Sequence, residues 1–304
     1  MKLSIIIPCF NSSQNINSLL DSIDSNVCNY NLHSDVEVIA IDDGSFDDTF
    51  SILREKSKSL KYLKVFSFDN AGAAITRERG IDLSCGQYIF FCDSDDIITS
   101  DFFSFFKYAY GNDIIYFSSD IVDKDHNDKV IYKKVSFDTD QYFYSGHSLL
   151  HFLLAKGQWT AAVWTYIFKR EILTSSQAKF TNRKAHEDHL FTLSILLNSK
   201  KIFCVKDVFY KQIITPGSLT SRISFDYVLE RYSAFKEARL FINNQVPRET
   251  KFLYDKWSYY SIFRLVKSID SCIFRKIYLL AYFFISDPGF FFRFFIYKLS
   301  ERKD

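Results

Sequence analysis

The sequence YIFFCDSDD, residues 88–96, places five apolar residues directly before three closely spaced carboxylates. An uninterrupted apolar run of this length is typical of a strand that is buried on both faces of a sheet. The carboxylates would then lie at the carboxyl end of the strand, the edge where open α/β sheets bind ligands. Asp93 and Asp95 are two residues apart, so in extended backbone they point to the same face and can hold Mg²⁺ or Mn²⁺ against phosphate oxygens. The alternative interpretation is an acidic turn that caps a helix.

The preceding residues repeat the same arrangement of an apolar strand followed by a helix. Apolar runs predict three earlier strands, at Leu3–Ile7, Val36–Ile41 and Tyr62–Phe66. Helical patterns lie between them, the first over Gln14–Ser25. This alternation over the first 95 or so residues predicts an α/β fold with a mostly parallel sheet and helices on both faces.

Polar side chains suited to a nucleotide follow three of the four predicted strands. Asn11 follows the first, the pair Asp42 and Asp43 follows the second, and Asp93 with Asp95 follows the fourth. Each group alone could be a helix cap. Because parallel strands end at one edge of a sheet, their convergence there favours a ligand site.

A second candidate site begins another predicted helix, at the tetrad His186–His189, whose sequence is His-Glu-Asp-His. Its carboxylates could act in acid–base catalysis, or they could interact with the positive end of the helix. The spacing of its two histidines does not match the HExxH pattern of zinc enzymes. Farther along, Ile202–Val205 and Val208–Tyr210 predict two short strands.

The composition limits the possible partners and cellular locations. The chain has 304 residues, which suits two domains or one domain with an appendage, and its net charge of +2 does not indicate binding to nucleic acid. The six cysteines form no CxxC pair, so neither a zinc site nor a disulfide framework is expected. We find no signal peptide and no apolar stretch of roughly 18 residues, and therefore expect a cytoplasmic protein.

The C-terminal part differs from the rest in charge and in aromatic content. From Arg222 onward, 15 Lys and Arg residues face 9 Asp and Glu residues, a net charge of +6. Two apolar runs, Ile277–Ile285 and Phe290–Ile296, are flanked by basic residues. A basic amphipathic segment with aromatic residues is typical of peripheral binding to the inner face of a membrane. The alternative is a terminal helix that packs on the body of the protein or in a dimer.

Four motifs, in this order, resemble the family 2 glycosyltransferases, the inverting enzymes with the GT-A fold. They are SIIIPCFN at 4–11, DDGS at 42–45, NAGAAITRERG at 70–80 and DSDD at 93–96. Farther on, Glu187-Asp188 is similar to the ED motif of the family. The segments 164–171 and 218–220 resemble its bacterial surface-polysaccharide branch. The resemblance covers residues 4 to about 220.

The resemblance implies roles for the residues that match these motifs. The strand end with Pro8 and Asn11 would meet the nucleobase, and Asp42, with Asp43 beside it, would contact uracil or ribose. In the third motif, Asn70, Gly72 and Arg77 would face the donor, with Arg77 offsetting charge or locking Asp42. Asp95 would hold the metal, while Asp93 would hold metal or ribose next to Ser94. Asp188 would be the general base, and Glu187 would position it or the acceptor.

The resemblance also implies a domain division and a reaction. Residues 1–221 would form the GT-A domain, with a nucleotide-binding half (1–110) and an acceptor half (111–221), and 222–304 a helical, membrane-associating appendage. The reaction would be metal-assisted transfer, by single displacement, from a nucleotide-diphospho sugar, most simply a UDP-sugar. The acceptor would be a glycan or lipid-linked glycan of O-antigen, capsule or lipopolysaccharide core. The alternatives are a sugar nucleotidyltransferase, which would need a Gly-rich loop after the first strand, and a non-catalytic membrane scaffold.

Two departures from the family pattern concern the predicted site. Arg79 stands where the family often has Asn, which we expect to alter only helix packing. No His follows Tyr210 to complete a metal shell, as one does in some members. The metal would then be held by Asp95, the donor diphosphate and water.

Overall fold

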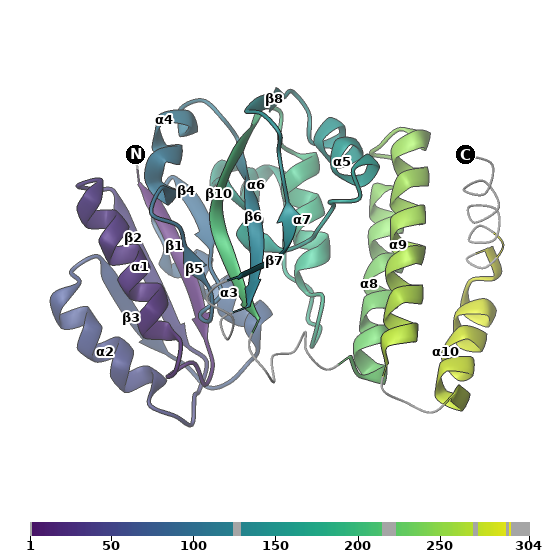
Figure 1. Cartoon of the computed structure of the whole chain (residues 1–304), viewed down its shortest axis with the longest axis horizontal. Helices are drawn as coiled ribbons and strands as arrows, with labels where there is room; N and C mark the ends of the chain where they lie inside the picture. The colour runs from purple at the N-terminus through teal and green to yellow at the C-terminus, as the bar shows by residue number, and fades with distance from the viewer. Residues whose placement is uncertain (1, 124–128, 215–222, 270–272, 290–291, 293–304) are drawn as a thin grey trace.

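The computed structural model describes residues 2–123, 129–214, 223–269, 273–289 and 292 (Figure 1). Its N-terminal half contains the four strands that the apolar runs predict, each within two residues of the expected bounds. They are β1 (Leu3–Cys9), β2 (Val36–Asp42), β3 (Leu63–Ser67) and β4 (Tyr88–Phe91). They pair in parallel in the order β3-β2-β1-β4, so that their carboxyl ends share one edge of the sheet.

The sheet continues beyond β4 with strands of both directions. Here β9 (Tyr166–Lys169) lies antiparallel between β4 and β6 (Ile114–Asp123), and β10 (Ile202–Ile214) pairs in parallel with β6. The short strands β5 (Ile97–Ile98), β7 (Lys129–Val135) and β8 (Gln141–Phe143) pair antiparallel with β10, β6 and β10 respectively. The described residues thus form one ten-stranded, mostly parallel sheet, as predicted.

Helices cover both faces of this sheet. In the N-terminal half they are α1 (Ile16–Asn29), α2 (Thr49–Ser59) and α3 (Ala73–Leu83). A 3₁₀ turn at Phe102–Phe105 and the single helical turn α4 (Phe106–Ala109) follow. In the second half they are α5 (Gly146–Ala155), a 3₁₀ turn at Val163–Thr165, α6 (Glu171–Ser176) and α7 (Asp188–Leu197).

The alternation of side chains along the strands builds two cores. In β1, Ile5 and Ile7 face the cluster under α1 and α2, whereas Ile6 faces the opposite cluster with α5 and α7. Because successive side chains of a strand point to opposite faces, a fully apolar strand serves both cores at once. On the second face α3 packs very close to β1, where a Cβ at Gly80 would lie 2.2 Å from Ile6.

One strand prediction is wrong. The segments Ile202–Val205 and Val208–Tyr210 are not two strands but parts of the single strand β10, which runs to Ile214. The pairing with β6 shifts its register on both sides of Val208. Such irregularities absorb extra residues without ending a strand, and this explains why the polar pair Lys206 and Asp207 does not break the pairing.

Three long helices follow the sheet: α8 (Phe225–Ile242), α9 (Arg248–Ser268) and α10 (Ile273–Ser286). Figure 1 shows them standing at one end of the sheet, with α10 outermost. Ala238, Ile242 and Tyr254 join the core of α5 and α7, while a third cluster holds α8, α9 and α10 together. The predicted boundary at residues 221 and 222 lies outside the described residues, and the division into a catalytic domain and a membrane-associating region stays a prediction.

The helix α10 contains the predicted apolar run Ile277–Ile285. Its Leu279 and Phe283 are buried against α8 and α9, whereas Phe274 and Ile285 are 76% and 77% exposed. The run Phe290–Ile296 lies outside the described residues except for Phe292. Within the part of the chain that the structure describes, no helix combines the length and the apolar character that crossing a membrane requires.

Candidate active site

The acids after β4 differ in environment although they are neighbours in sequence. Asp96 is buried, and it accepts hydrogen bonds from the Tyr210 hydroxyl at 2.7 Å and the Ile213 N–H at 2.8 Å. It therefore fastens the turn after β4 to β10. Asp93 and Asp95 remain partly exposed at the end of the strand, where the sequence predicts a ligand site.

Arg77 of α3 connects the two predicted acidic motifs. Its guanidinium donates to Asp93 Oδ1 at 2.9 Å and to Glu187 Oε1 at 2.6 Å, and it lies over the ring of Phe180. The expectation that Arg77 could lock Asp42 is wrong. Asp42 instead accepts from the Ser67 hydroxyl at 3.0 Å, so a neighbouring strand holds it.

Asp43 holds the loop that leads into α3. Its two carboxylate oxygens accept the backbone N–H groups of Ala71 and Gly72 at 2.9 and 2.8 Å. Gly72 has a φ of +85°, a conformation that a residue with a Cβ rarely adopts. A Cβ at this position would have no other atom within 4 Å, so the space beside the backbone is open. Asn70 donates from its amide to the Asp43 carbonyl at 2.8 Å. These residues shape the loop beside the candidate site.

The remaining residues that are predicted to bind the nucleotide-sugar donor lie at the ends of the neighbouring strands and in the turns that follow them. Asn11 has a φ of +49° and accepts from the Phe46 N–H at 2.9 Å, which ties the end of β1 to the loop after β2. Ser94 shares a hydrogen bond of 2.7 Å with Ser12. Pro8 lies in β1 opposite Ile41. All of these residues follow or end parallel strands at the same edge of the sheet.

Asp188 is the first residue of α7 and is partly buried. Burial and the neighbouring Glu187 carboxylate raise its pKa to about 7, while Arg77 and Arg231 act in the opposite direction. A carboxylate with a pKa near 7 is well suited to accept a proton at neutral pH. Arg77 donates to both Glu187 and Asp93, so this arginine links the residue next to Asp188 with the acids after β4.

The two histidines of the tetrad form hydrogen bonds with residues of α8 and α9. His186 has a left-handed φ of +63° and its Nδ1 lies 3.0 Å from an Arg231 nitrogen. His189 is buried, with its Nε2 2.5 Å from the Tyr254 hydroxyl. The two imidazole rings thus contact different residues, one on α8 and one on α9.

The predicted ligands of a divalent cation are the carboxylates of Asp93 and Asp95. Burial, followed by the charge of Asp93, raises the pKa of Asp95 to about 6, so two like charges lie close together at this edge. A bound cation would relieve that repulsion, and hard oxygen donors suit Mg²⁺ or Mn²⁺. The described residues contain no cluster of three or more His, Cys, Asp or Glu side chains that could hold a metal by themselves.

Several residues near the predicted site residues have no role that the sequence predicted. Phe10 and Phe46 are 47% and 90% exposed, and their rings meet edge to face at 6.2 Å. Exposed aromatic residues in the turns that follow β1 and β2 are the signal that could have found them. The sequence contains no such signal for Lys134 and Arg231, because their electrostatic interaction with Asp188 depends on how β7 and α8 pack in the folded protein.

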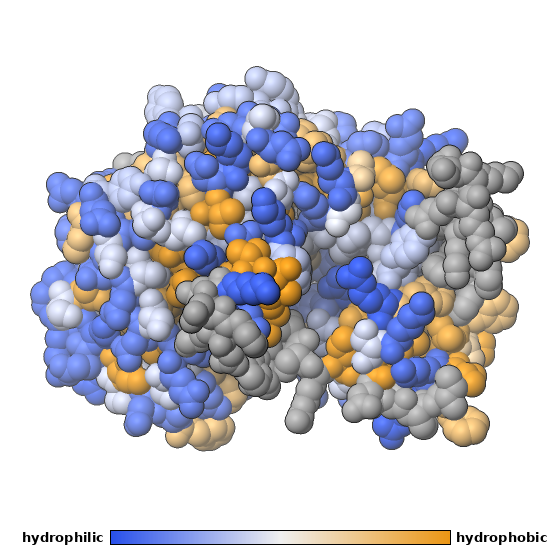
Figure 2. Space-filling model, viewed as in Figure 1, coloured by the Kyte–Doolittle hydropathy of each residue, from blue (hydrophilic) through white to orange (hydrophobic). Residues whose placement is uncertain are grey.

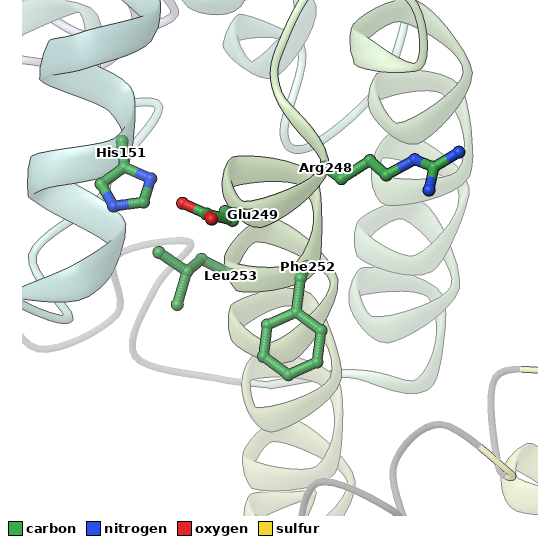
Figure 3. Close-up of a pocket in the computed structure, with 5 residues that line it drawn as sticks. All are labelled: His151, Arg248, Glu249, Phe252 and Leu253. Carbon is green, nitrogen blue, oxygen red and sulfur yellow. The ribbon is translucent and has the colours of Figure 1, made fainter.

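The surface has two further features. Figure 2 shows a hollow between the sheet and the C-terminal helices, with both hydrophilic and hydrophobic side chains beside it. A separate pocket lies between α5 and α9, where His151 faces Glu249 and Leu253 (Figure 3). None of the predicted site residues lines that second pocket.

Comparison with known proteins identifies relatives across most of the chain. The sequence model of glycosyl transferase family 2 matches residues 4–173. The cholesterol galactosyltransferase of Borreliella burgdorferi is 26% identical over 73% of the chain, and the chain spans 63% of its length. The poly(ribitol-phosphate) β-N-acetylglucosaminyltransferase TarP of Staphylococcus aureus is 26% identical over 80% of the chain and 75% of its own length.

Solved structures give the same fold. The crystal structure of S. aureus TarS residues 1–349 in complex with UDP-GlcNAc superimposes with a TM-score of 0.68. The match covers 88% of the present chain and 74% of TarS 1–349, at 23% sequence identity. The likeness establishes a GT-A-type fold for the sheet and its flanking helices.

Proposed function

Since the chain belongs to glycosyl transferase family 2, we propose that it transfers a sugar from a nucleotide-diphospho donor to a hydroxyl of a bacterial surface glycan. The observation that carries the proposal is the Arg77 bridge. It brings Asp93, at the end of β4, and Glu187, next to Asp188, within hydrogen-bond distance of one guanidinium. A donor site and a basic carboxylate at one sheet edge are what a transfer reaction requires.

The donor is a UDP-sugar. The structural neighbour TarS was crystallised with UDP-GlcNAc, and the turns after β1 and β2 offer the exposed rings of Phe10 and Phe46 for contact with a base. The Asp42 carboxylate accepts from Ser67 and from the Ser45 N–H, and each of its oxygens has a second acceptor position for a uracil N–H. Asp43, Asn70 and Gly72 keep the neighbouring loop in shape.

Asp95, together with Asp93, would hold Mg²⁺ or Mn²⁺ against the donor diphosphate. Such an ion, when bound, stabilises the negative charge that the leaving UDP acquires. Arg77 keeps Asp93 in place and supplies a positive charge beside the diphosphate site. Each of these contributions makes UDP a better leaving group.

Asp188 acts as the general base. It removes the proton of the acceptor hydroxyl as the hydroxyl oxygen attacks the anomeric carbon, and UDP departs from the opposite side. One displacement inverts the configuration, so an α-linked donor gives a β-linked product. Glu187 fixes the start of α7, and with it Asp188, through its bond to Arg77.

The acceptor is a polysaccharide or lipid-linked glycan, and the protein reaches it at a membrane surface through α10. The outer face of that helix exposes Phe274, Ile277, Tyr278, Phe284 and Ile285, next to Arg275 and Lys276. Apolar and aromatic side chains beside cations suit the interface of an anionic bilayer. The relatedness to TarP supports a surface-polymer acceptor.

Incubation with a panel of UDP-sugars, with and without Mn²⁺, tests the proposal. We expect metal-dependent thermal stabilisation by UDP and slow hydrolysis of one UDP-sugar. Release of UDP with transfer to water separates an enzyme from a scaffold, and formation of UDP-sugar from UTP would indicate a nucleotidyltransferase. If no nucleotide stabilises the protein, the proposed function is wrong.

A further inference from the structure

Two cations from outside the nucleotide-binding half reach Asp188. Lys134 lies on β7 and Arg231 on α8, and each interacts electrostatically with the other and with Asp188. Burial, followed by the charge of Arg231, lowers the pKa of Lys134 to about 8, and Asp188 acts in the opposite direction. Lys134 and Arg231 are therefore two like charges, and a bound anion would relieve the repulsion between them.

Arg231 is held in place without being neutralised. It donates to His186 Nδ1 at 3.0 Å and to the Ser261 hydroxyl at 3.2 Å, and its guanidinium carbon lies over the Trp257 ring. None of the described carboxylates lies within ion-pair distance of its guanidinium. By contrast Arg239, two turns farther along α8, forms ion pairs with two aspartates. A guanidinium that is fixed in place without a direct ion pair suits an anionic ligand.

Two buried nitrogen atoms, one of Arg231 and one of its neighbour His186, have no hydrogen-bond partner among the described residues. Arg231 Nε is buried without an acceptor, and so is His186 Nε2. Burial and the charge of Arg231 lower the pKa of His186 to about 2, so the ring is neutral. Because its Nδ1 accepts from Arg231, its proton is on Nε2, which is a donor. Buried donors without acceptors are rare in proteins and indicate a ligand or an ordered water.

We propose that Lys134, His186 and Arg231 form a subsite for a phosphate group that the acceptor carries beside its reacting hydroxyl. The inference rests on the proposed function, since it places the phosphate next to the base Asp188. A guanidinium on α8, an ammonium group on β7 and an imidazole N–H from the loop before α7 are all hydrogen-bond donors, and a tetrahedral phosphate can accept from all three. A neutral sugar would not offset two adjacent cations.

Binding of small phosphates to the full chain tests the subsite. UDP and Mg²⁺ are kept at saturation so that the donor diphosphate site is filled. Inorganic phosphate, glycerol 3-phosphate, bis(glycerol) phosphate diester, glucuronate and glycerol are then titrated. Tryptophan fluorescence reports binding, because Trp257 lies 5.4 Å from the Arg231 guanidinium. The variants are Arg231→Gln and Lys134→Gln, with Lys236→Gln, an exposed lysine of α8, as the matched control.

We expect saturable binding of glycerol 3-phosphate and the diester, and no response to glycerol. Each of Arg231→Gln and Lys134→Gln should weaken binding about 10-fold or more, the effect of losing one charged hydrogen bond, and Lys236→Gln should not. An unchanged melting temperature and UDP affinity of the variants establish that they fold. If Arg231→Gln does not fold, Arg231→Lys, which keeps the charge, takes its place and should lose less affinity than Lys134→Gln.

Three results would overturn the subsite. They are equal binding by wild type and both variants, binding of glucuronate in preference to both phosphate esters, and binding of free phosphate without binding of the esters. The last would indicate a site for the free ion. UDP affinity, measured in the same samples, separates the two proposals. If the wild-type protein does not bind UDP, the proposed function is contradicted. If the wild-type protein binds UDP but neither phosphate ester, only the subsite is contradicted.

Discussion

The Arg77 guanidinium lies 2.6 Å from the Glu187 carboxylate, although 110 residues separate them in sequence. The same guanidinium binds Asp93, so one side chain of α3 joins the end of β4 to the start of α7. The side chain of Arg77 is only 8% exposed. A buried cation with two carboxylate partners is stable only as a complete set, because any charge left alone would remain desolvated.

Arg77→Met should destabilise the protein by about 3–5 kcal/mol, since it leaves two carboxylates without their cation. Urea denaturation measures the change. Arg54→Met, which removes an exposed arginine of α2, is the control and should change stability little. A double-mutant cycle with Glu187→Gln should give a coupling energy above about 1 kcal/mol. A loss of stability no larger than that of the control would contradict the bridge.

The pH dependence of transfer should follow Asp188, whose pKa is about 7. A general base must be deprotonated, so kcat/KM should rise with pH, pass its inflection near pH 7 and level off only above about pH 8. An ordinary aspartate would already give the plateau near pH 5. His33→Gln, which removes an exposed histidine, should leave the inflection unchanged.

Asp188→Asn should lower kcat by about 10²-fold or more and leave UDP affinity unchanged, since only the proton acceptor is lost. Initial rates with a soluble acceptor and calorimetry with UDP measure the two quantities. Turnover similar to wild type would remove Asp188 from the role of base.

Asp95→Asn should remove the effect of Mn²⁺ on UDP binding. We expect UDP to bind about 10-fold or more weakly than to wild type when Mn²⁺ is present, and equally without it. Calorimetry in both conditions measures this. Asp101→Asn, which changes an exposed aspartate outside the site, is the matched control. A metal response of Asp95→Asn equal to that of the control would exclude Asp95 as a ligand.

Tyr210→Phe should destabilise the protein by about 1–3 kcal/mol, because Asp96 would lose the hydroxyl that donates to it at 2.7 Å. The same hydroxyl accepts from the Asp93 N–H at 3.1 Å, so UDP affinity should fall as well. Tyr110→Phe, at a tyrosine that is 94% exposed, is the control for thermal denaturation. Equal melting temperatures of the two variants would contradict the bracing role of Asp96.

Ile285→Ser should weaken binding to anionic vesicles if α10 lies in the membrane interface, because a residue that is 77% exposed would no longer enter the bilayer. Leu240→Ser, at an equally exposed position of α8, is the matched control and should bind like wild type. Vesicle sedimentation measures both. Membrane binding that survives deletion of all residues after Ser271 would contradict the assignment.

The strands of the N-terminal half could be predicted because their apolar runs serve two cores. Ile5, Ile6 and Ile7 are all fully buried, so an unbroken run was the correct signal. Prediction failed at β10, where Lys206 and Asp207 interrupt the pattern and the register shifts absorb them. Hydrophobic pattern records burial, whereas register depends on the neighbouring strand.

The sequence by itself determined which polar residues follow the strands, because parallel strands bring their carboxyl ends to one edge. It did not distinguish Asp96, which fastens β10, from Asp95, which stays partly exposed. Only the tertiary structure decided that Arg77 binds Glu187 and that Lys134 and Arg231 reach Asp188. Local patterns fix the periodicity of each element, but the distance between charges on β7, α3, α7 and α8 is set by how those elements pack.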